Sequence, residues 1–307
     1  LLSIKSFVDF DITDLIQDGN GGDARYPCLH TLWHVVFLSL ETPRLPTFHG
    51  AVPFPSLRRL SFFSRYPFGD DTPFRGNAAT LETLKIGLDL ATVEVLRRYN
   101  VFTPTSHPRL HYVHAELTSS LVPGHFASAA DCVKFAFSIA PKASARTIEV
   151  REKVGLLNYH EMLLICSHTS IQYLSLPGTP ITLLAVIRLI RSLPLLTDLH
   201  TMMPTIGDMP SDAIMDEHFA LENPSCESSG RRFRCWLLAG KESEVTLEAV
   251  MCVLELALRF PNFDYAAVPN NRREQFMNLM AEIIAKDRYK QYAPRLQRLL
   301  FHGWKCR

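Results

Sequence analysis

The side chains of this chain that could carry out chemistry are mainly histidines and carboxylates. His107, His111 and His114 fall within one short segment, as the ligands of a metal ion would. A zinc ion needs ligands that converge on it at about 2 Å. Because His111 and His114 lie three apart on a predicted strand, they point to opposite faces of a sheet. We therefore expect no metal site here.

Two further groups have the residue types of an active site but the wrong setting. His30 and His34 would converge only on a helix, whereas the segment around them is predicted to be a strand. Asp70 and Asp71 lie in a stretch rich in glycine and proline, which is typical of a solvated turn. No phosphate-loop, dinucleotide-binding, metalloprotease or serine-hydrolase motif occurs in the sequence. We expect no catalytic residue and no cofactor.

The enzymatic alternative rests on a long segment, residues 202–232, that is interpreted as an acidic loop insertion. Loops of this length without secondary structure are usually functional or disordered. The segment contains His218, and His200 lies just before it. Its acidic residues are Asp208, Asp212, Asp216, Glu217, Glu222 and Glu227. A hydrolytic enzyme would have to use these carboxylates and histidines, and this is the least favoured function.

Composition excludes several classes of partner and compartment. The chain has 32 Lys and Arg residues against 31 acidic residues, so no general positive field would attract nucleic acid. The apolar stretch 181–196 is interrupted by Arg188, Arg191 and Pro194, short of the roughly 20 residues that cross a membrane. Seven scattered cysteines without a C-x-x-C pair suit a reducing compartment. We expect a cytoplasmic or nuclear protein without nucleic-acid or membrane partners.

A recurring spacing of apolar residues predicts the architecture. "HPRLHYVHAEL" and "APRLQRLLFHGW" share proline, arginine and leucine, followed by apolar residues three and five positions after the leucine. This pattern predicts a short strand. Its leading residues are at positions 32, 57, 81, 110, 145, 171, 196, 233, 263 and 296. For the first copy, Leu32 is preferred to Leu29 as the leading residue. The result is about ten repeats over residues 30–302, with a proline two residues before the leading position in half of them.

Segments with helical periodicity separate the predicted strands. The strongest are 182–193, 246–260 and 273–287, and weaker ones lie near 92–99, 126–139 and 157–167. A repeated strand and helix cannot bury its apolar face alone, so neighbouring units must stack. We expect a single α/β domain over residues 1–307, a solenoid with a parallel curved sheet inside and helices outside.

The repeat resembles the leucine-rich-repeat family over about residues 30–302, and its irregular spacing is similar to that of F-box proteins of this family. The resemblance implies a horseshoe with its sheet on the concave face. The asparagine or cysteine that follows the last leucine in the family is absent here. The phrases "RRYNVFTPTSHP", "RFRCWLL", "PNFDYAAVP" and "YAPRLQRLLFHGW" are also similar to leucine-rich-repeat-like proteins of early-diverging fungi.

Alternation along each strand predicts which side chains face outward on the concave surface. They are Arg59, Phe63, Lys85, Tyr112, His114, Glu149, Arg151, Tyr173, Asp198, His200, Tyr265 and Arg298. Tyrosine and arginine are enriched among the residues that dominate protein interfaces. We expect a non-catalytic domain that binds another protein. One form of this function is substrate recognition in an F-box ubiquitin-ligase receptor, with an adaptor-binding segment upstream of Leu1. The other is a scaffold without a connection to ubiquitin.

Overall fold

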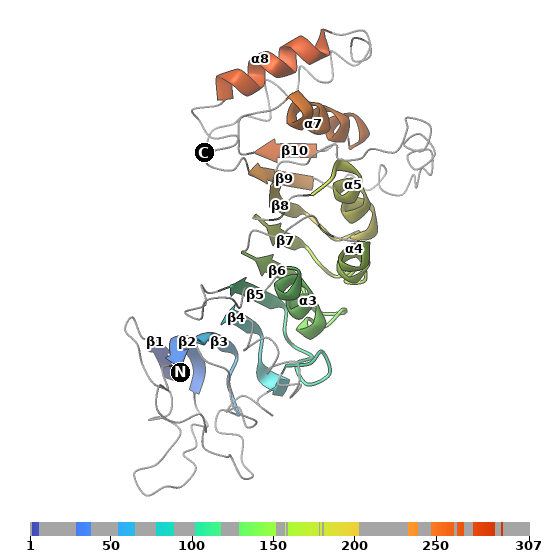
Figure 1. The fold of residues 1–307 in the computed structure, drawn as a ribbon. Helices are drawn as coiled ribbons and strands as arrows, with labels where there is room; N and C mark the ends of the chain where they lie inside the picture. The colour runs from blue at the N-terminus through green and yellow to red at the C-terminus, as the bar shows by residue number, and fades with distance from the viewer. Residues whose placement is uncertain are drawn as a thin grey trace, which may run out of the picture. The chain divides into compact units, whose positions relative to one another are not determined.

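The structure is a computed structural model, shown in Figure 1. It describes residues 2–5, 29–37, 55–64, 78–88, 102–117, 129–151, 157, 159–177, 179, 181–202, 233–238, 247–260, 263–266, 273–285 and 290. Where the sequence predicts one continuous domain, the chain divides into two compact units. The first unit contains residues 1–152 and 163–171, and the second contains residues 153–162 and 172–307.

Within its described residues, the first unit contains six parallel strands that follow one another in chain order. They are β1 (Leu2–Lys5), β2 (Leu29–Phe37), β3 (Arg59–Ser64), β4 (Thr83–Leu88), β5 (Tyr112–Leu117) and β6 (Thr147–Val150). A short 3-10 helix, η1 (Ala78–Thr80), precedes β4, and helix α3 (Ala129–Ile139) joins β5 to β6 and packs against both strands. A helical crossover is the usual way to connect parallel neighbours.

The second unit repeats this arrangement. Its parallel strands are β7 (Tyr173–Leu176), β8 (Asp198–Met202), β9 (Phe233–Leu238) and β10 (Phe263–Ala266). Its helices are α5 (Leu183–Ser192), α7 (Leu247–Arg259) and α8 (Arg273–Ile284), while α4 (Tyr159–Cys166) has residues in both units. The protein is therefore α/β with parallel strands, as the sequence predicts. No helix in the described ranges is both long and apolar enough to cross a membrane.

The predicted apolar positions form the core. In the third to seventh repeats, every residue at the three template positions is at most 2% exposed. These residues are Leu81, Leu84, Ile86, Leu110, Val113, Ala115, Ala145, Ile148, Val150, Ile171, Leu174, Leu176, Leu196, Leu199 and, in place of an apolar residue, Thr201. Helices contribute their apolar stripes to this layer, as α5 does with Leu183, Ile187 and Ile190. The pattern of three apolar positions therefore identifies the buried side of each described strand in these repeats.

Helix α5 shows how local sequence sets an element's ends. Thr182 precedes the helix in an extended conformation, and its Oγ1 accepts a hydrogen bond from the Ala185 N–H at 3.2 Å. This satisfies one of the backbone donors that a helix start leaves unpaired. At the other end, Leu193 N–H donates to Leu189 O, and Pro194 cannot continue the helix.

A hydroxyl in front of three described strands links each of their repeats to the one before it. Thr80 Oγ1 donates to Leu57 O at 2.8 Å, Ser144 Oγ donates to Leu110 O at 3.2 Å, and Ser170 Oγ donates to Ala145 O at 2.8 Å. Each donor directly precedes a leading apolar residue, and each acceptor is the leading residue of the previous repeat. The same hydroxyls also lie 2.6 to 3.2 Å from a second carbonyl, that of Pro55, Pro108 or Lys142. We call these three hydroxyl groups and their carbonyl acceptors the hydroxyl ladder. The ladder stabilises the residues that lead into the strands.

Removing one step of the hydroxyl ladder should lower stability moderately. Ser170→Ala leaves the carbonyls of Lys142 and Ala145 without their donor, so we expect the free energy of unfolding to fall by about 1 kcal/mol. Thr169→Ala is the control, because the neighbouring Thr169 is exposed and has no hydrogen bond within the described residues. Urea unfolding followed by circular dichroism measures both. Equal effects of the two changes would contradict the role of the ladder.

Four strands differ from the sequence prediction. In the first repeat, Leu32 pairs with Leu60, the second template position of its repeat, so Leu29 rather than Leu32 is the leading residue. The prediction of Leu32 is wrong because a bulge after Leu32 adds one residue to β2. In β9, Cys235 pairs with Leu199, one residue away from the predicted Trp236. Strand β1 was not predicted.

The register of β10 follows that of β9, so it is also shifted by one residue. Tyr265 pairs with Cys235 and is thus in line with the buried Leu199. The prediction that Tyr265 occupies an outward position is therefore not supported by the pairing. The tenth predicted repeat, with Arg298, and the predicted helix near 92–99 lie outside the described residues.

Candidate functional site

The outward positions of the first unit form rows that cross its strands. Ser61, Lys85, His114 and Glu149 are successive register partners in β3 to β6. A second row consists of Arg59, Thr83, Tyr112 and Thr147. Both rows alternate along the strands with buried apolar residues, so they belong to the opposite face of the sheet from the core. Polar and aromatic side chains from four strands therefore share one surface, which we call the first outward face.

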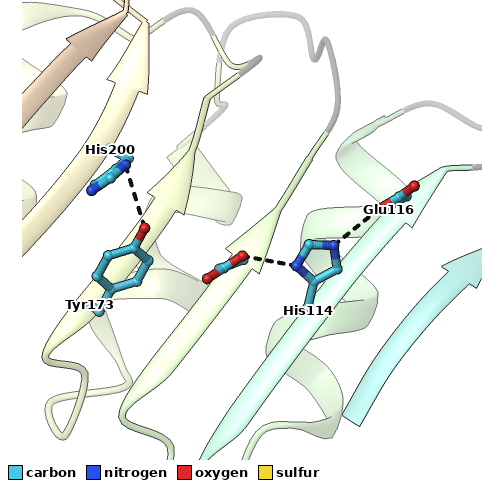
Figure 2. Close-up of polar contacts among 5 residues, drawn as sticks. His114, Glu116, Tyr173 and His200 are labelled. Atoms are coloured by element: carbon cyan, nitrogen blue, oxygen red, sulfur yellow. Dashed lines mark hydrogen bonds and ion pairs between the residues drawn. The ribbon is translucent and has the colours of Figure 1, made fainter. Parts of the chain in front are cut away.

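His114 is the centre of a hydrogen-bonded cluster on the first outward face. Its Nδ1 lies 2.9 Å from Glu149 Oε2, and its Nε2 lies 3.2 Å from Glu116 Oε2. Figure 2 shows one of these contacts at each nitrogen of the ring. One ring thus lies within hydrogen-bond distance of carboxylates from both β5 and β6.

Glu149 has the electrostatic surroundings of a stable carboxylate. The hydrogen bond from His114 is the largest cause that lowers the pKa of Glu149, and it outweighs the opposing effect of burial. The charges of His114 and Arg151 and a hydrogen bond with Tyr112 lower the pKa of Glu149 further. Glu149 is thus ionised and held in place by its neighbours.

His114 does not lie open to a partner, which corrects the sequence prediction. Its side chain is 2% exposed, compared with 16% for Glu149 and 31% for Glu116. Alternation places the residue on the outward face but does not reveal that neighbouring side chains cover the ring. His114 therefore holds the Glu116 and Glu149 side chains in place and is too buried to contact a partner directly.

The other two histidines of the sequence cluster have separate surroundings. His111 is exposed, and its Nδ1 lies 3.3 Å from Arg109 O. His107 is buried, with Nδ1 3.1 Å from Thr103 O and its ring 5.2 Å from that of Phe102. Burial lowers the pKa of His107. Across the described ranges, no group of three or more histidine, cysteine, aspartate or glutamate residues could hold a metal ion.

The second unit has its own outward face, formed by β7 and β8. The Tyr173 hydroxyl lies 3.4 Å from His200 Nδ1, and the two ring centroids are 4.8 Å apart (Figure 2). Asp198 is the register partner of Tyr173 and accepts a hydrogen bond from Thr197 Oγ1 at 3.0 Å. Tyrosine, histidine and aspartate thus lie together here, and all three are partly exposed.

The remaining predicted residues divide by exposure. Arg59 and Arg151 are exposed, whereas Lys85 and Tyr112 are partly buried. Phe63 lies in β3 opposite Gly87, and its side chain is outside the described part. Residues 203–232, which include His218 and the acidic residues of the predicted loop insertion, also lie outside it.

Sequence reasoning missed a column of residues that comes just before the strands. Backbone hydrogen bonds align Arg58 with His30, Glu82 with Arg58, His111 with Glu82, and Arg146 with His111. Arg58 and Glu82 form an ion pair at 3.8 Å. These residues directly follow the leading apolar residue of their repeats, and this position is the signal that could have identified them. Trp236 was also missed, because the register shift of β9 makes it the partner of His200.

A groove on the first unit offers the enzymatic alternative little support. It has a volume of about 610 Å³ and is lined by Pro104, Pro108, Phe137, Pro141, Leu164 and His168, among others. His168 is its histidine, but its Nδ1 lies 2.9 Å from Leu164 O and its Nε2 lies 3.2 Å from Ala140 O. Both ring nitrogens therefore lie close to backbone carbonyls, and Nδ1 also lies 3.2 Å from Ser167 Oγ. The lining is mainly apolar, and its polar residues are Thr105, Ser138, Lys142, Ser144 and His168.

No protein-family model matches the sequence, and no curated protein matches it either.

Proposed function

We propose that this chain is a leucine-rich-repeat-like solenoid that binds another protein through the outward faces of its parallel strands. The observation that carries the proposal is the composition of these faces. Partly exposed Tyr112 and Tyr173 lie among charged side chains on strands whose other side is fully apolar. Tyrosine and arginine supply much of the binding energy of protein interfaces.

The proposed function fits an open surface better than a catalytic pocket. Small-molecule sites are concave and bury most of their ligand, whereas the strand rows present side chains side by side at the roughly 4.8 Å spacing of a sheet. The proposal includes a horseshoe in which these faces are concave. Its narrower form, based on the resemblance to F-box proteins, makes the partner a substrate of a ubiquitin ligase.

Changes on the outward faces should weaken capture of the partner. We expect Tyr112→Ala, Arg151→Ala and Tyr173→Ala each to cost about 1 kcal/mol or more of binding free energy, a loss of about fivefold or more. Partly exposed aromatic and exposed arginine side chains can be truncated without opening the core. The measurement is a quantitative pull-down from a lysate of the source organism, followed by titration of the captured partner in recombinant form.

The matched controls are Arg188→Ala in α5 and Glu282→Ala in α8, two charged helical residues. These changes should leave capture within about twofold of the unaltered chain, since surface substitutions outside an interface are close to neutral. Loss of capture with the helical variants, and none with the three outward variants, would refute binding by the outward faces.

A further inference from the structure

The acidic residues of the first outward face and of the column just before its strands are already paired with basic groups of the same two sets. Glu82 lies 3.8 Å from Arg58, Glu116 lies 3.2 Å from His114, and Glu149 lies 2.9 Å from His114. The buried His114 ring thereby pairs with two carboxylates, those of Glu116 and Glu149. These three glutamates are consequently bound within the surface and contribute little negative charge toward a partner.

The basic residues of the same face outnumber its acidic residues. The described outward positions and the column in front of the strands carry Arg58, Arg59, Lys85, Arg146 and Arg151 against Glu82, Glu116 and Glu149. This is an excess of two positive charges, 5 − 3, in a face that represents a small part of a chain with a net charge of +1. The excess is therefore local, and the overall composition conceals it.

Three of these arginines remain available. Arg59, Arg146 and Arg151 are exposed, and none of them forms an ion pair within the described residues. An exposed guanidinium presents a planar set of donors that matches a carboxylate in two parallel hydrogen bonds. This surface thus combines paired carboxylates with exposed guanidinium groups, and among these the charge of Arg151 also acts on the Glu149 carboxylate.

We infer that the first outward face, together with the column of residues just before its strands, binds an extended acidic segment of a partner protein, whose carboxylates pair with Arg59, Arg146 and Arg151. The inference rests on the proposed protein-binding function and specifies the chemistry of the partner. Complementary charge of this kind selects a partner and accelerates its association. Tyr112, which lies between these arginines in register, supplies a partly exposed aromatic surface for the side chains between the acidic ones.

The spacing of the strands sets the spacing of the acidic residues. Arg59 begins β3, whereas Arg146 and Arg151 flank β6, three strands further along the sheet. Arg59 is in register with Thr147, so three strand spacings of about 4.8 Å put it about 14 Å from Arg146, which is one residue out of register. Arg151 lies four residues beyond Thr147 and is therefore about 20 Å from Arg59. An extended chain covers these distances in about four and about six residues, so carboxylates with these spacings in an extended segment can reach both ends of the face.

The experiment uses the full chain and a defined probe. The probe is a fluorescein-labelled peptide of about 15 residues with glutamate at alternate positions and serine or tyrosine between them, and its counterpart has glutamine in place of glutamate. Fluorescence anisotropy measures binding at low salt. We expect the glutamate peptide to bind at least about tenfold more tightly than the glutamine peptide, and this preference should weaken at physiological salt because exposed charges are screened.

Two charge-matched variants locate the binding. The double change Arg59→Glu and Arg151→Glu should weaken binding of the glutamate peptide at least about tenfold, through loss of attraction and added repulsion. The control, Lys142→Glu with Arg188→Glu, alters net charge equally outside the first outward face and should change binding less than about twofold. Arg59→Gln with Arg151→Gln repeats the test without repulsion, in case the doubly reversed chain does not fold.

Three results would overturn the inference. They are equal losses in the two charge-matched variants, no preference for the glutamate peptide, and tighter binding of an oligothymidylate of equal charge, which would indicate a phosphate-binding surface instead. If any of these occurs while Tyr112→Ala and Tyr173→Ala still weaken capture of the partner, the proposed protein-binding function stands and only the acidic partner is rejected.

Discussion

Leu174→Ala and Leu199→Ala should each lower the free energy of unfolding by about 2–5 kcal/mol. The two leucines are register partners in β7 and β8, and both are 0% exposed. Each change removes apolar contacts and leaves a cavity that the surrounding strands and helices cannot close completely. A loss of this size is a large part of the stability of an ordinary domain.

The chain provides a matched control for these core changes. Leu195 is 51% exposed, so Leu195→Ala removes the same atoms without opening a cavity and should cost less than about 1 kcal/mol. Urea unfolding of the three variants, monitored by circular dichroism, compares them under one condition. If Leu195→Ala were as destabilising as Leu174→Ala, the inward register of the strands would be wrong.

The buried side of the strands could be predicted from the sequence because burial there depends on one repeated pattern. Leucine-like residues at three fixed positions suffice to mark the core, and Leu81, Leu84 and Ile86 show all three positions buried. Helices were predicted for the same reason: the apolar period of α5, α7 and α8 is long and regular. Local patterns carry this information without reference to distant residues.

Register could not be predicted where two alternatives satisfy the same pattern. Leu29 and Leu32 are both leucines at suitable spacing, and the choice depends on the bulge in β2, which pairing with β3 determines. The segment at β9 contains Phe233, Trp236 and Leu238 in one register and Cys235 with Leu237 in the other. A one-residue slip exchanges the faces of every side chain, so these errors also changed the expected outward residues.

The side-chain contacts on the first outward face also could not be predicted from the sequence. Alternation correctly places Lys85, His114 and Glu149 in one row, but the pairing of His114 with carboxylates from two strands depends on side-chain conformations. The hydroxyl ladder was hidden for a similar reason, since Thr80, Ser144 and Ser170 are ordinary turn residues until the carbonyl acceptors of the preceding repeat are known.

Breaking the contact between His114 and Glu149 should destabilise the first unit at neutral pH. Glu149→Gln removes the negative charge beside the buried ring while preserving the shape of the side chain. Hydrogen bonds to charged groups contribute about 1.5–3 kcal/mol, so we expect a loss of about 1–3 kcal/mol. Glu82→Gln is the matched control, because its partner Arg58 has a side chain 55% exposed and such surface pairs contribute little.

The effect of Glu149→Gln should depend on pH in one direction. Because the pKa of Glu149 is lower in the folded protein than its ordinary value of 4.5, its ionised form stabilises the fold fully above that value. As the pH falls below 4.5 toward the lowered pKa, the folded carboxylate becomes protonated and the stabilisation is lost. The difference in unfolding free energy between the unaltered chain and Glu149→Gln should therefore shrink in acid.

Urea unfolding at neutral pH and at a series of pH values below 4.5 measures this difference. Burial lowers the pKa of His107, so the fold also loses stability as the pH falls below the ordinary value of 6.5 for that residue. His107 is present in both proteins, and its contribution cancels in the comparison. A difference that stays constant down to strongly acidic pH would show that the charge of Glu149 does not stabilise the fold.

A double-mutant cycle with His114→Gln, Glu149→Gln and the two changes together separates the coupling of the two side chains from their individual effects. Additive losses of unfolding free energy would mean that the His114 ring does not hold the Glu149 carboxylate in place.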